Sequence, residues 1–294
     1  NAFGRARSMV HAVDGVSFAV KRGSTFVLVG ESGSGKTTTA LASVRLVEPT
    51  SGQVLLMGDD ITRLDAEELR LRRRHMQFVF QDPYASLNPR ERVGDIVRRP
   101  LDLMRVGSRS ERRARVDELF ALVGLRKEHQ QLFPHQFSGG QRQRIGIARA
   151  LATRPELVVC DEPVSALDVA IQAQILNLLM RLKHEFGLTY VFISHDLAVV
   201  QHVCDEIAVM YLGRIVESGA RRQVFSRPSH PYTLALLSAA PGGDTDTPVW
   251  GPRIKLQGDP QPEVGPQISR HDAARPVEPQ EAFKVIIAAD VVTA

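Results

Sequence analysis

The sequence predicts an α/β fold in which a mixed sheet is interrupted by an inserted helical subdomain. Short apolar runs rich in β-branched residues alternate with longer segments of helical periodicity, which is typical of sheet strands covered by helices. The run at 207–218 looks like a hairpin and adds an antiparallel strand. In contrast, the stretch 82–135 has no convincing strand and is rich in arginine and helix formers, so we expect it to be helical.

The individual elements follow from these patterns. Strands are expected in runs of apolar residues bounded by turn residues, at 24–30, 53–58, 76–81, 156–162, 188–194 and 207–218. Helices are expected where apolar residues recur at helical spacing, at 36–46, 110–123, 140–153, 169–185 and 196–203.

The domain organisation is predicted from changes in composition. We expect one main domain over residues 1–240, with the helical subdomain at about 82–150. Beyond it the chain turns to Pro, Gly and Asp, so residues 241–294 are expected to form a poorly ordered or accessory tail, apart from the apolar run KVIIAADVV.

The composition excludes several classes of protein. Of the 294 residues, 43% are hydrophobic and 24% are charged, as in an ordinary globular protein, and the formal charge of +4 selects no partner by itself. The two cysteines, Cys160 and Cys204, form no CxxC pair, which argues against a disulfide framework or zinc site and fits a reducing cytosol. No apolar run approaches the roughly 20 residues that span a bilayer.

A glycine-rich loop, GESGSGKT, follows the first expected strand and opens a helix, which is the context a phosphate-binding loop requires. Its glycines let consecutive backbone N–H groups face phosphate oxygens, and the helix dipole favours the negative charge. Lys36 would reach the terminal phosphates, and Thr37 would offer its hydroxyl to magnesium. A chance glycine-rich turn is the alternative. The expected nucleotide-contact residues are Gly30, Glu31, Ser32, Gly33, Ser34, Gly35, Lys36, Thr37 and Thr38.

Two acids stand at the carboxyl end of an apolar strand, in LVVCDEP, at the edge where open α/β sheets bind ligands. Asp161 suits a direct or indirect ligand of magnesium, and Glu162 is placed to accept a proton from, or to orient, an attacking water. Neighbouring side chains on a strand point to opposite faces, so both acids serve one site only if the strand ends here, which Pro163 favours. A solvated acid pair at a strand end is the alternative.

Two more polar residues stand at strand exits. His195 could hydrogen-bond a terminal phosphate, although a lone histidine there is more often a surface residue. Gln81 precedes the helical insert, and its amide can contact both magnesium and the nucleophilic water while moving with the segment beyond it. Neither residue identifies a function by itself.

A second potential anion site stands in FSGGQRQRIGIARAL, where a serine and two glycines precede a helix. A simple helix cap by Ser138 is the structural alternative. Together with the preceding motifs, this stretch resembles the ATPase subunits of ABC transporters up to about residue 240, and the resemblance implies their cassette fold. Residues 30–37 resemble the Walker A loop, Gln81 the Q-loop and residues 138–141 the signature loop. Asp161 and Glu162 resemble the Walker B strand and the catalytic glutamate.

The remaining matches make the resemblance specific. SALD at 165–168 is similar to the D-loop and His195 to the switch histidine. In this family the signature loop closes over a γ-phosphate held by the partner's Walker A loop. The resemblance therefore implies that Ser138, Gly139 and Gly140 bind in trans, that Gln141 supports their loop, and that Asp168 joins the same nucleotide site.

Four further sequence segments indicate one branch of this family. FQDPYASLNPR, LDVAIQAQILNLL, MYLGRIVESG and SHPYTLALLSA resemble the oligopeptide/dipeptide importers, whose branch also imports nickel and glutathione. The resemblance implies ATP and Mg²⁺ as cofactors, a second and commonly non-identical ATPase subunit, two permease subunits and, indirectly, an extracytoplasmic solute-binding protein. It also implies a peripheral location at the cytoplasmic face of the membrane, and an aromatic residue stacked on adenine, for which Phe3 is the candidate.

The residues leave two alternative functions. One is a non-transport ABC ATPase that docks on a soluble enzyme complex. The ATPases of carbon–phosphorus lyase are of this kind and have similar sequence motifs. A nucleotide-gated structural subunit with little turnover is disfavoured because Glu162 and His195 fill both catalytic positions. The basic run RLRRRH at 70–75 lacks interleaved aromatics, so we expect a solvated helix face and no nucleic acid.

Overall fold

The computed structural model describes residues 12–239 and 281–289, so Phe3, the candidate for stacking on adenine, lies outside the described residues. Its centre is a mixed sheet whose first five strands run parallel and whose last strand returns antiparallel, which confirms the predicted fold class. In spatial order the strands are β5 (Met76–Val79), β6 (Leu157–Asp161), β7 (Thr189–Ser194), β2 (Thr25–Val29), β8 (Glu206–Tyr211) and β9 (Arg214–Ala220). The carboxyl ends of the parallel strands therefore meet at one edge.

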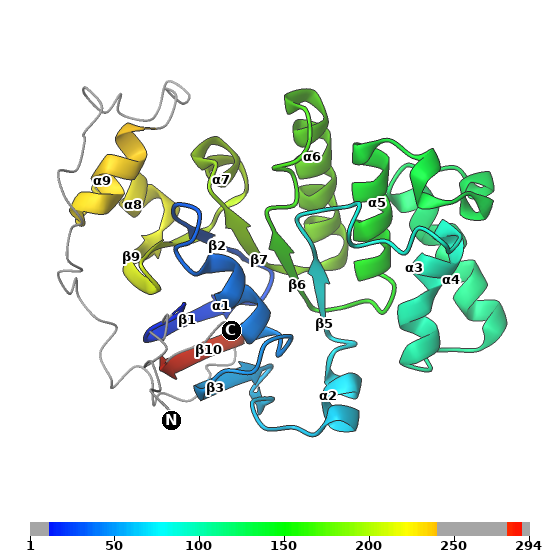
Figure 1. Ribbon diagram of the computed structural model, residues 1–294, viewed down its shortest axis with the longest axis horizontal. Coiled ribbons are helices and arrows are strands. Elements are labelled where there is room, and N and C mark those ends of the chain that lie inside the picture. Colours follow the sequence, from blue (N-terminus) through cyan, green and yellow to red (C-terminus); the bar gives the residue numbers. More distant parts are fainter. Residues whose placement is uncertain (1–11, 240–280, 290–294) are drawn as a thin grey trace, which may run out of the picture.

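The central strand β2 separates two hydrophobic cores. Its alternate residues Phe26 and Leu28 pack with α1 (Lys36–Ser43) and a second, smaller sheet. Val27 and Val29 pack on the other side, with the long helix α6 (Val169–Phe186) among their neighbours. Because both faces of β2 are buried, the strand is continuously apolar from Phe26 to Val29 instead of alternating. Figure 1 shows α1 and α6 on either side of these strands.

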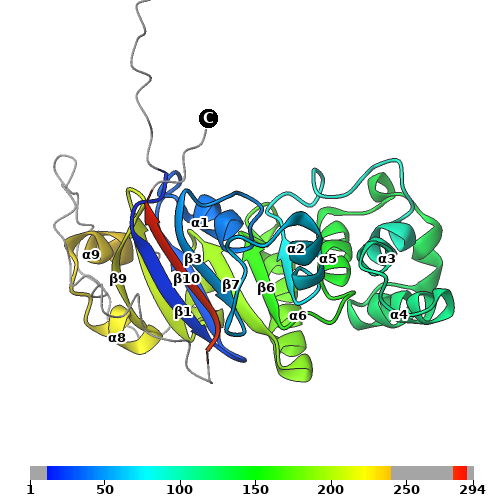
Figure 2. The ribbon, with the colours of Figure 1, turned by 90° about the horizontal axis from the view of Figure 1, so that it is seen from below.

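The second sheet has the order β1 (Val16–Lys21), β10 (Glu281–Ala289), β3 (Ser51–Leu56) and β4 (Asp59–Asp60). Figure 2 shows β10 lying between β1 and β3 across the larger sheet. Val285 is opposite both Phe18 and Val54, and the pairing is antiparallel on each side. A segment more than two hundred positions downstream thus fills the middle of this sheet.

Side-chain packing holds β10 in place. Phe283, Val285 and Ile287 are fully buried, as expected for alternate residues on the inner face of a strand. The Phe18 ring stacks on Phe26 with centroids 4.7 Å apart and meets the edge of the Phe283 ring at 6.4 Å. The expected division at residue 240 therefore leaves out one strand of the main domain, and the rest of the expected tail lies outside the described residues.

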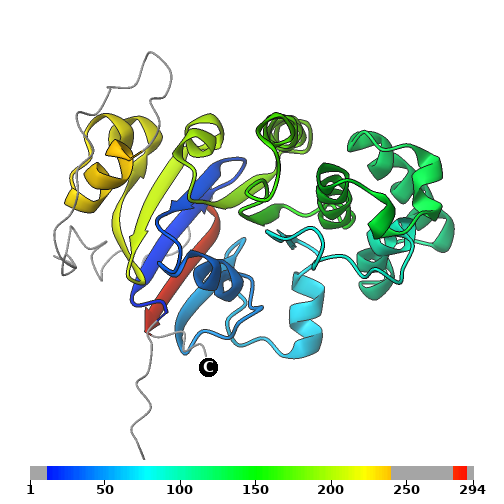
Figure 3. The ribbon, with the colours of Figure 1, turned by 45° about the horizontal axis from the view of Figure 1, so that its top comes forward.

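Between β5 and β6 the described chain forms only helices. They are α3 (Val93–Leu103), α4 (Arg109–Leu122), the 3₁₀ helices η1 (Lys127–Gln131) and η2 (Pro134–Gln136), and α5 (Gly139–Ala150). Figure 3 shows them gathered, cyan to green, at one end of the molecule. Phe120 and Ile145 are fully buried in their shared core.

Shorter helices complete the structure. They are α2 (Ala66–Arg72), α7 (Leu197–Val203), α8 (Arg221–Ser226) and α9 (Pro231–Ser238). The basic run at 70–75 begins on α2 and continues beyond its end. In the described ranges, no helix is long and apolar enough to cross a membrane.

Phe283→Ala tests whether β10 stabilises the fold. Because the Phe283 ring is fully buried, its removal leaves a cavity and should lower the free energy of unfolding by about 3–5 kcal/mol. Urea unfolding measures this change. Phe186→Ala, which truncates a ring that is 39% exposed, is the control and should cost much less. Equal stability of the Phe283 variant and the wild type would mean that β10 does not dock.

Candidate active site

The phosphate loop joins β2 to α1 and has a backbone that only glycine fits. Gly30 and Gly35 have φ angles of 153° and 99°. A Cβ atom at Gly30 would lie 2.2 Å from the Met210 carbonyl oxygen, and one at Gly35 would lie 2.3 Å from that of Ala12. The glycines therefore serve both the curl of the loop and its close approach to two other backbone segments.

Lys36 lies at the start of α1 with its ammonium group inside the loop. Its Nζ donates hydrogen bonds to the Gly30 and Glu31 carbonyl oxygens, at 2.8 and 2.7 Å. Burial lowers the pKa of Lys36, although the nearby charges of Glu162 and Asp161 act in the opposite direction. A positive charge is thus held where this loop type binds phosphate.

A tyrosine outside the sequence prediction also touches the loop. The Tyr232 hydroxyl accepts a hydrogen bond from the Glu31 N–H at 3.0 Å, and its ring packs 4.4 Å from that of Tyr211. Burial raises the pKa of Tyr232 to about 12, so the hydroxyl stays neutral. Tyr232 lies in SHPYTLALLSA, which the sequence analysis used only for the branch resemblance.

The two acids adopt different backbone conformations. β6 ends at Asp161, one residue before the end of the expected strand 156–162, and Glu162 has a φ angle of 43°, in the left-handed region. This change of conformation interrupts the strand alternation that would send the two side chains to opposite faces. Thr37 Oγ1 donates to Asp161 Oδ1 at 3.2 Å, which joins the Walker B-like strand to the phosphate loop.

The Glu162 carboxylate is the meeting point of the predicted catalytic residues. One oxygen, Oε1, lies 3.0 Å from His195 Nδ1, and the other, Oε2, accepts a hydrogen bond from Gln81 Nε2 at 3.0 Å. The carboxylate side chain is 13% exposed, so water can still reach it. Three residues that follow three neighbouring strands, β5, β6 and β7, are therefore brought together.

The oxygen groups beside the loop fit a hard divalent cation. Burial, together with the charge of Glu162, raises the pKa of Asp161 to about 6, while Thr37 and Lys36 act in the opposite direction. A buried carboxylate whose negative charge is not fully balanced, next to the Thr37 hydroxyl, suits Mg²⁺. In the described residues no group of three His, Cys, Asp or Glu side chains could hold a metal ion.

The signature-like stretch forms the capped start of α5. Ser138 Oγ accepts from the Gln141 N–H at 3.3 Å, and Gln141 Oε1 accepts from the Ser138 N–H at 3.0 Å, which makes a reciprocal capping box. A Cβ at Gly140 would lie 2.5 Å from Ile171 Cγ2, so glycine allows α5 to approach α6. Asp168 immediately precedes α6 and is exposed.

The structure does not bring this stretch to the phosphate loop of the same chain. Among the hydrogen bonds of the described residues, none joins 138–141 to 30–38. Figure 1 shows α5 on the far side of β5 and β6 from α1. The chain therefore has two separate phosphate-binding candidates.

Two arginines of α5 tie it to the segment that follows Gln81. The Arg142 guanidinium lies 3.5 Å above the Tyr84 ring, and Arg149 donates to the Ser86 carbonyl oxygen. The sequence contains no local signal for these two contacts. These contacts link Gln81 mechanically to the helix that begins with the signature-like stretch.

The comparisons with known proteins agree with this geometry. Residues 13–165 match the family model described as ABC transporter. The oligopeptide transport ATP-binding protein AppF of Bacillus subtilis (strain 168) is 50% identical over 267 residues, which cover 90% of this chain and 81% of that protein. The dipeptide transport ATP-binding protein DppF of Escherichia coli (strain K12) is 51% identical over 251 residues, which cover 85% and 75%.

A solved structure is also similar. The ATP-binding cassette MJ0796, in a dimeric post-hydrolysis state bound to ADP and Pi, superposes with a TM-score of 0.67 at 32% identity. The match covers 74% of this chain and 94% of that one.

Asp161→Asn tests the buried charge. Because burial raises the native pKa of Asp161 to about 6, the native state binds this proton more tightly than the unfolded chain does. The protonated Asp161 carboxyl therefore contributes to the free energy of unfolding below about pH 4, and this contribution is lost as the pH rises through 6. Relative to the wild type, the variant should thus gain on the order of 2 kcal/mol in free energy of unfolding between pH 4 and 7.

Urea unfolding without nucleotide, repeated across this pH range, measures the difference. Asp168→Asn, which alters an exposed carboxylate, is the control. A difference between Asp161→Asn and the wild type that does not change with pH would contradict the assignment.

Proposed function

Because this chain belongs to the ABC transporter family, we infer that it pairs with a second ATPase subunit, binds ATP between the two, and drives two permease subunits. It is an ATP-binding subunit of a peptide importer, the function named for relatives that share about half of its sequence. One observation carries the enzymatic part of this inference. Gln81, Glu162 and His195 converge beside a phosphate loop, at the ends of adjacent strands.

The residues divide the work of hydrolysis. Lys36 and the loop N–H groups hold the phosphates of ATP. Glu162 orients the attacking water and takes its proton as the bond between the γ-phosphorus and the bridging oxygen of ADP breaks. Gln81 and His195 fix the Glu162 carboxylate, and we assign the second ring nitrogen of His195 to the γ-phosphate.

Magnesium fits the same site. We propose that Thr37, Asp161 and Gln81 hold Mg²⁺, which would neutralise phosphate charge when bound. The support is the hydrogen bond between Thr37 and Asp161 and the raised pKa of the Asp161 carboxyl, caused mainly by its burial.

We propose that residues 138–140 complete the nucleotide site of the partner subunit. The capped start of α5 is suited to an anion, yet it has no hydrogen bond to the phosphate loop of its own chain among the described residues. A head-to-tail pair with twofold or pseudo-twofold symmetry would give each loop a partner. The dimeric state of MJ0796 with ADP and Pi supports this arrangement for a similar cassette. Gln141 and Asp168 would line the same interface.

A conformational change at the nucleotide site would be transmitted through Gln81. Loss of the γ-phosphate changes the surroundings of Glu162, which holds Gln81, and the segment beyond Gln81 is tied to α5 by Arg142 and Arg149. The helices between β5 and β6 would then carry the motion to the permeases. We propose that this helical subdomain spans about 82–150.

The assembly can be tested by isolating it. We expect the chain, expressed with its genomic neighbours and extracted from membranes in detergent, to co-purify with a related ATPase and two polytopic permeases. The two ATPase subunits would lie at the cytoplasmic face of the membrane. An extracytoplasmic binding protein would deliver the peptide. Recovery with a soluble enzyme complex and no polytopic protein would favour the non-transport alternative.

Glu162→Gln tests the general base. Glutamine keeps an oxygen to accept the hydrogen bond from Gln81, but it cannot take a proton from water. Phosphate release by the assembled pair should fall by about 10²–10⁴-fold, while ATP binding, measured by calorimetry, persists. Unchanged turnover would remove Glu162 from this role.

Gly139→Glu tests binding in trans. A Cβ at Gly139 would lie 3.3 Å from Leu167 Cδ2, which is tight but can be accommodated. The new carboxylate should leave ATP binding to the isolated chain unchanged and abolish hydrolysis in the assembled pair, because it would repel the partner's γ-phosphate. Ala121→Glu, on the exposed surface of α4, is the control. A collapse of ATP affinity in the isolated Gly139 variant would place the loop in its own nucleotide site.

A further inference from the structure

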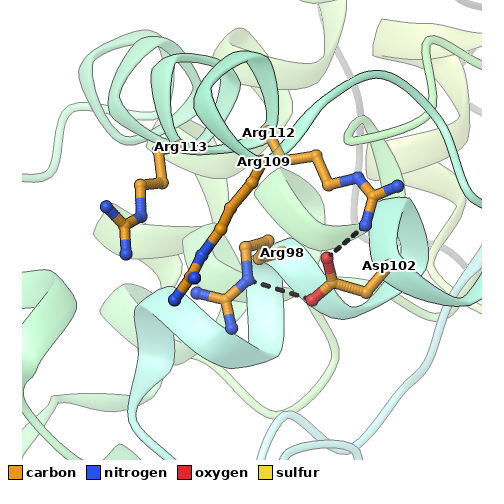
Figure 4. A pocket seen from close by; sticks show the side chains of 5 residues that line it. All are labelled: Arg98, Asp102, Arg109, Arg112 and Arg113. Atoms are coloured by element: carbon orange, nitrogen blue, oxygen red, sulfur yellow. Dashed lines mark hydrogen bonds and ion pairs between the residues drawn. The ribbon is translucent and has the colours of Figure 1, made fainter.

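A cationic pocket lies in the helical region, between α3 and α4, and plays no part in the site described above. It has a volume of about 280 Å³, and its lining consists of Arg98, Asp102, Arg109, Arg112 and Arg113. Figure 4 shows these side chains, which reach the pocket from both helices. The lining therefore contains four guanidinium groups and one carboxylate, and Arg98 also pairs with Asp95, outside the lining, at 2.8 Å.

Both oxygens of the Asp102 carboxylate already accept a hydrogen bond. Arg98 Nε donates to Asp102 Oδ2 and Arg112 Nη1 donates to Asp102 Oδ1, both at 2.9 Å. Although burial acts to raise the pKa of Asp102, these two bonds prevail and lower it. Asp102 is thus ionised and pairs with two of the four arginines, Arg98 and Arg112.

The other two arginines have no such partner. In the described ranges 12–239 and 281–289, no ion pair involves Arg109 or Arg113. Figure 4 shows Arg109 and Arg113 reaching the pocket from α4, without a dashed line to Asp102. The nearest acid of the same helical turn, Glu111, caps the Ser108 N–H at 2.6 Å. The positive end of the α4 dipole adds to this uncompensated charge.

The chemistry of the lining selects the ligand. Planar guanidinium forks match the several oxygens of a phosphate group. The lining contains no aromatic or apolar side chain, so nothing in it would recognise a base or a hydrocarbon chain. The volume is close to the lower limit of ordinary ligand pockets, which suits a compact headgroup better than a nucleotide or a folded peptide.

We propose that the pocket between α3 and α4 binds a phosphate-bearing anion, as a free phosphate compound or as the headgroup of an anionic phospholipid. The anion bridges Arg109 and Arg113 of α4 to Arg98 of α3 and so holds the two helices together. Because α3 and α4 pack against α5, occupancy of the pocket steadies the helix that begins at Ser138. The site does not depend on the proposed transport function.

The test compares two double variants of the full chain. Arg109→Ala with Arg113→Ala removes the two unpaired guanidinium groups and keeps both bonds to Asp102. Arg222→Ala with Arg227→Ala removes the same charge from an exposed surface and is the control. Equal thermal unfolding midpoints of both variants and the wild type verify that the fold is intact.

Two probes separate the possible sources of phosphate. Pyrophosphate is titrated by calorimetry at constant ionic strength, with the phosphate loop saturated by magnesium and a non-hydrolysable ATP analogue. Vesicles of phosphatidylcholine, with and without phosphatidylglycerol, are tested by co-sedimentation. We expect the wild type to bind at least one probe saturably, and the Arg109/Arg113 variant to bind it about tenfold more weakly or worse, since two charged hydrogen-bonding groups are lost.

The outcomes decide the proposal. Binding of pyrophosphate alone assigns a soluble phosphate compound, and binding only of vesicles with phosphatidylglycerol assigns a lipid headgroup. Arg109→Lys with Arg113→Lys keeps the charge but loses the forks, and it should bind between the wild type and the alanine variant. Absence of saturable binding to both probes, or an equal loss in the Arg222/Arg227 control, would overturn the proposal.

Discussion

The left-handed backbone of Glu162 is the constraint on which the active site depends. A non-glycine residue in this region stores on the order of 1–3 kcal/mol, so the surrounding structure must hold it. The Glu162 N–H donates to the Ile193 carbonyl oxygen at 3.0 Å, and the Ser165 hydroxyl donates to the Glu162 carbonyl oxygen at 3.1 Å. In this conformation the carboxylate contacts both Gln81 and His195. The parallel sheet brings the strand ends to one edge, and the backbone conformation of Glu162 places its carboxylate between Gln81 and His195.

The phosphate loop is held in the same way, by segments that are distant in the sequence. The backbone at Met210 and at Ala12 approaches two of its glycines, and the Tyr232 hydroxyl binds the Glu31 N–H. The motif alone therefore defines where the loop is, whereas its shape also depends on the hairpin, on the lead-in to β1 and on α9. Changes in any of these segments reach the nucleotide site without touching a motif residue.

Patterns of short range made the parallel core and the motif residues predictable. Gln81, Glu162 and His195 were placed together because parallel strands share an edge, which is a property of topology that periodicity reveals. The strand β1 and the helices α2, α8 and α9, each of eight residues or fewer, were not predicted, because short elements carry few periodic positions. The helix α3 lies in the stretch 82–135, which was expected to be helical but without bounds for its individual helices. The contacts of Tyr232, Arg142 and Arg149 arise from tertiary packing, for which one sequence contains no local signal.

The position of β10 also has a consequence for how the chain folds during synthesis. Phe18 and Val54 leave the ribosome early, but the residue between them, Val285, is translated more than two hundred residues later. Until then β1 and β3 have open hydrogen-bonding edges, the kind of edge that recruits strands from other chains. Such non-local pairing raises the contact order and slows the final step of folding. Newly made chains therefore pass through a period of exposure to aggregation, in which a chaperone could hold them, and the closing of this sheet ends it.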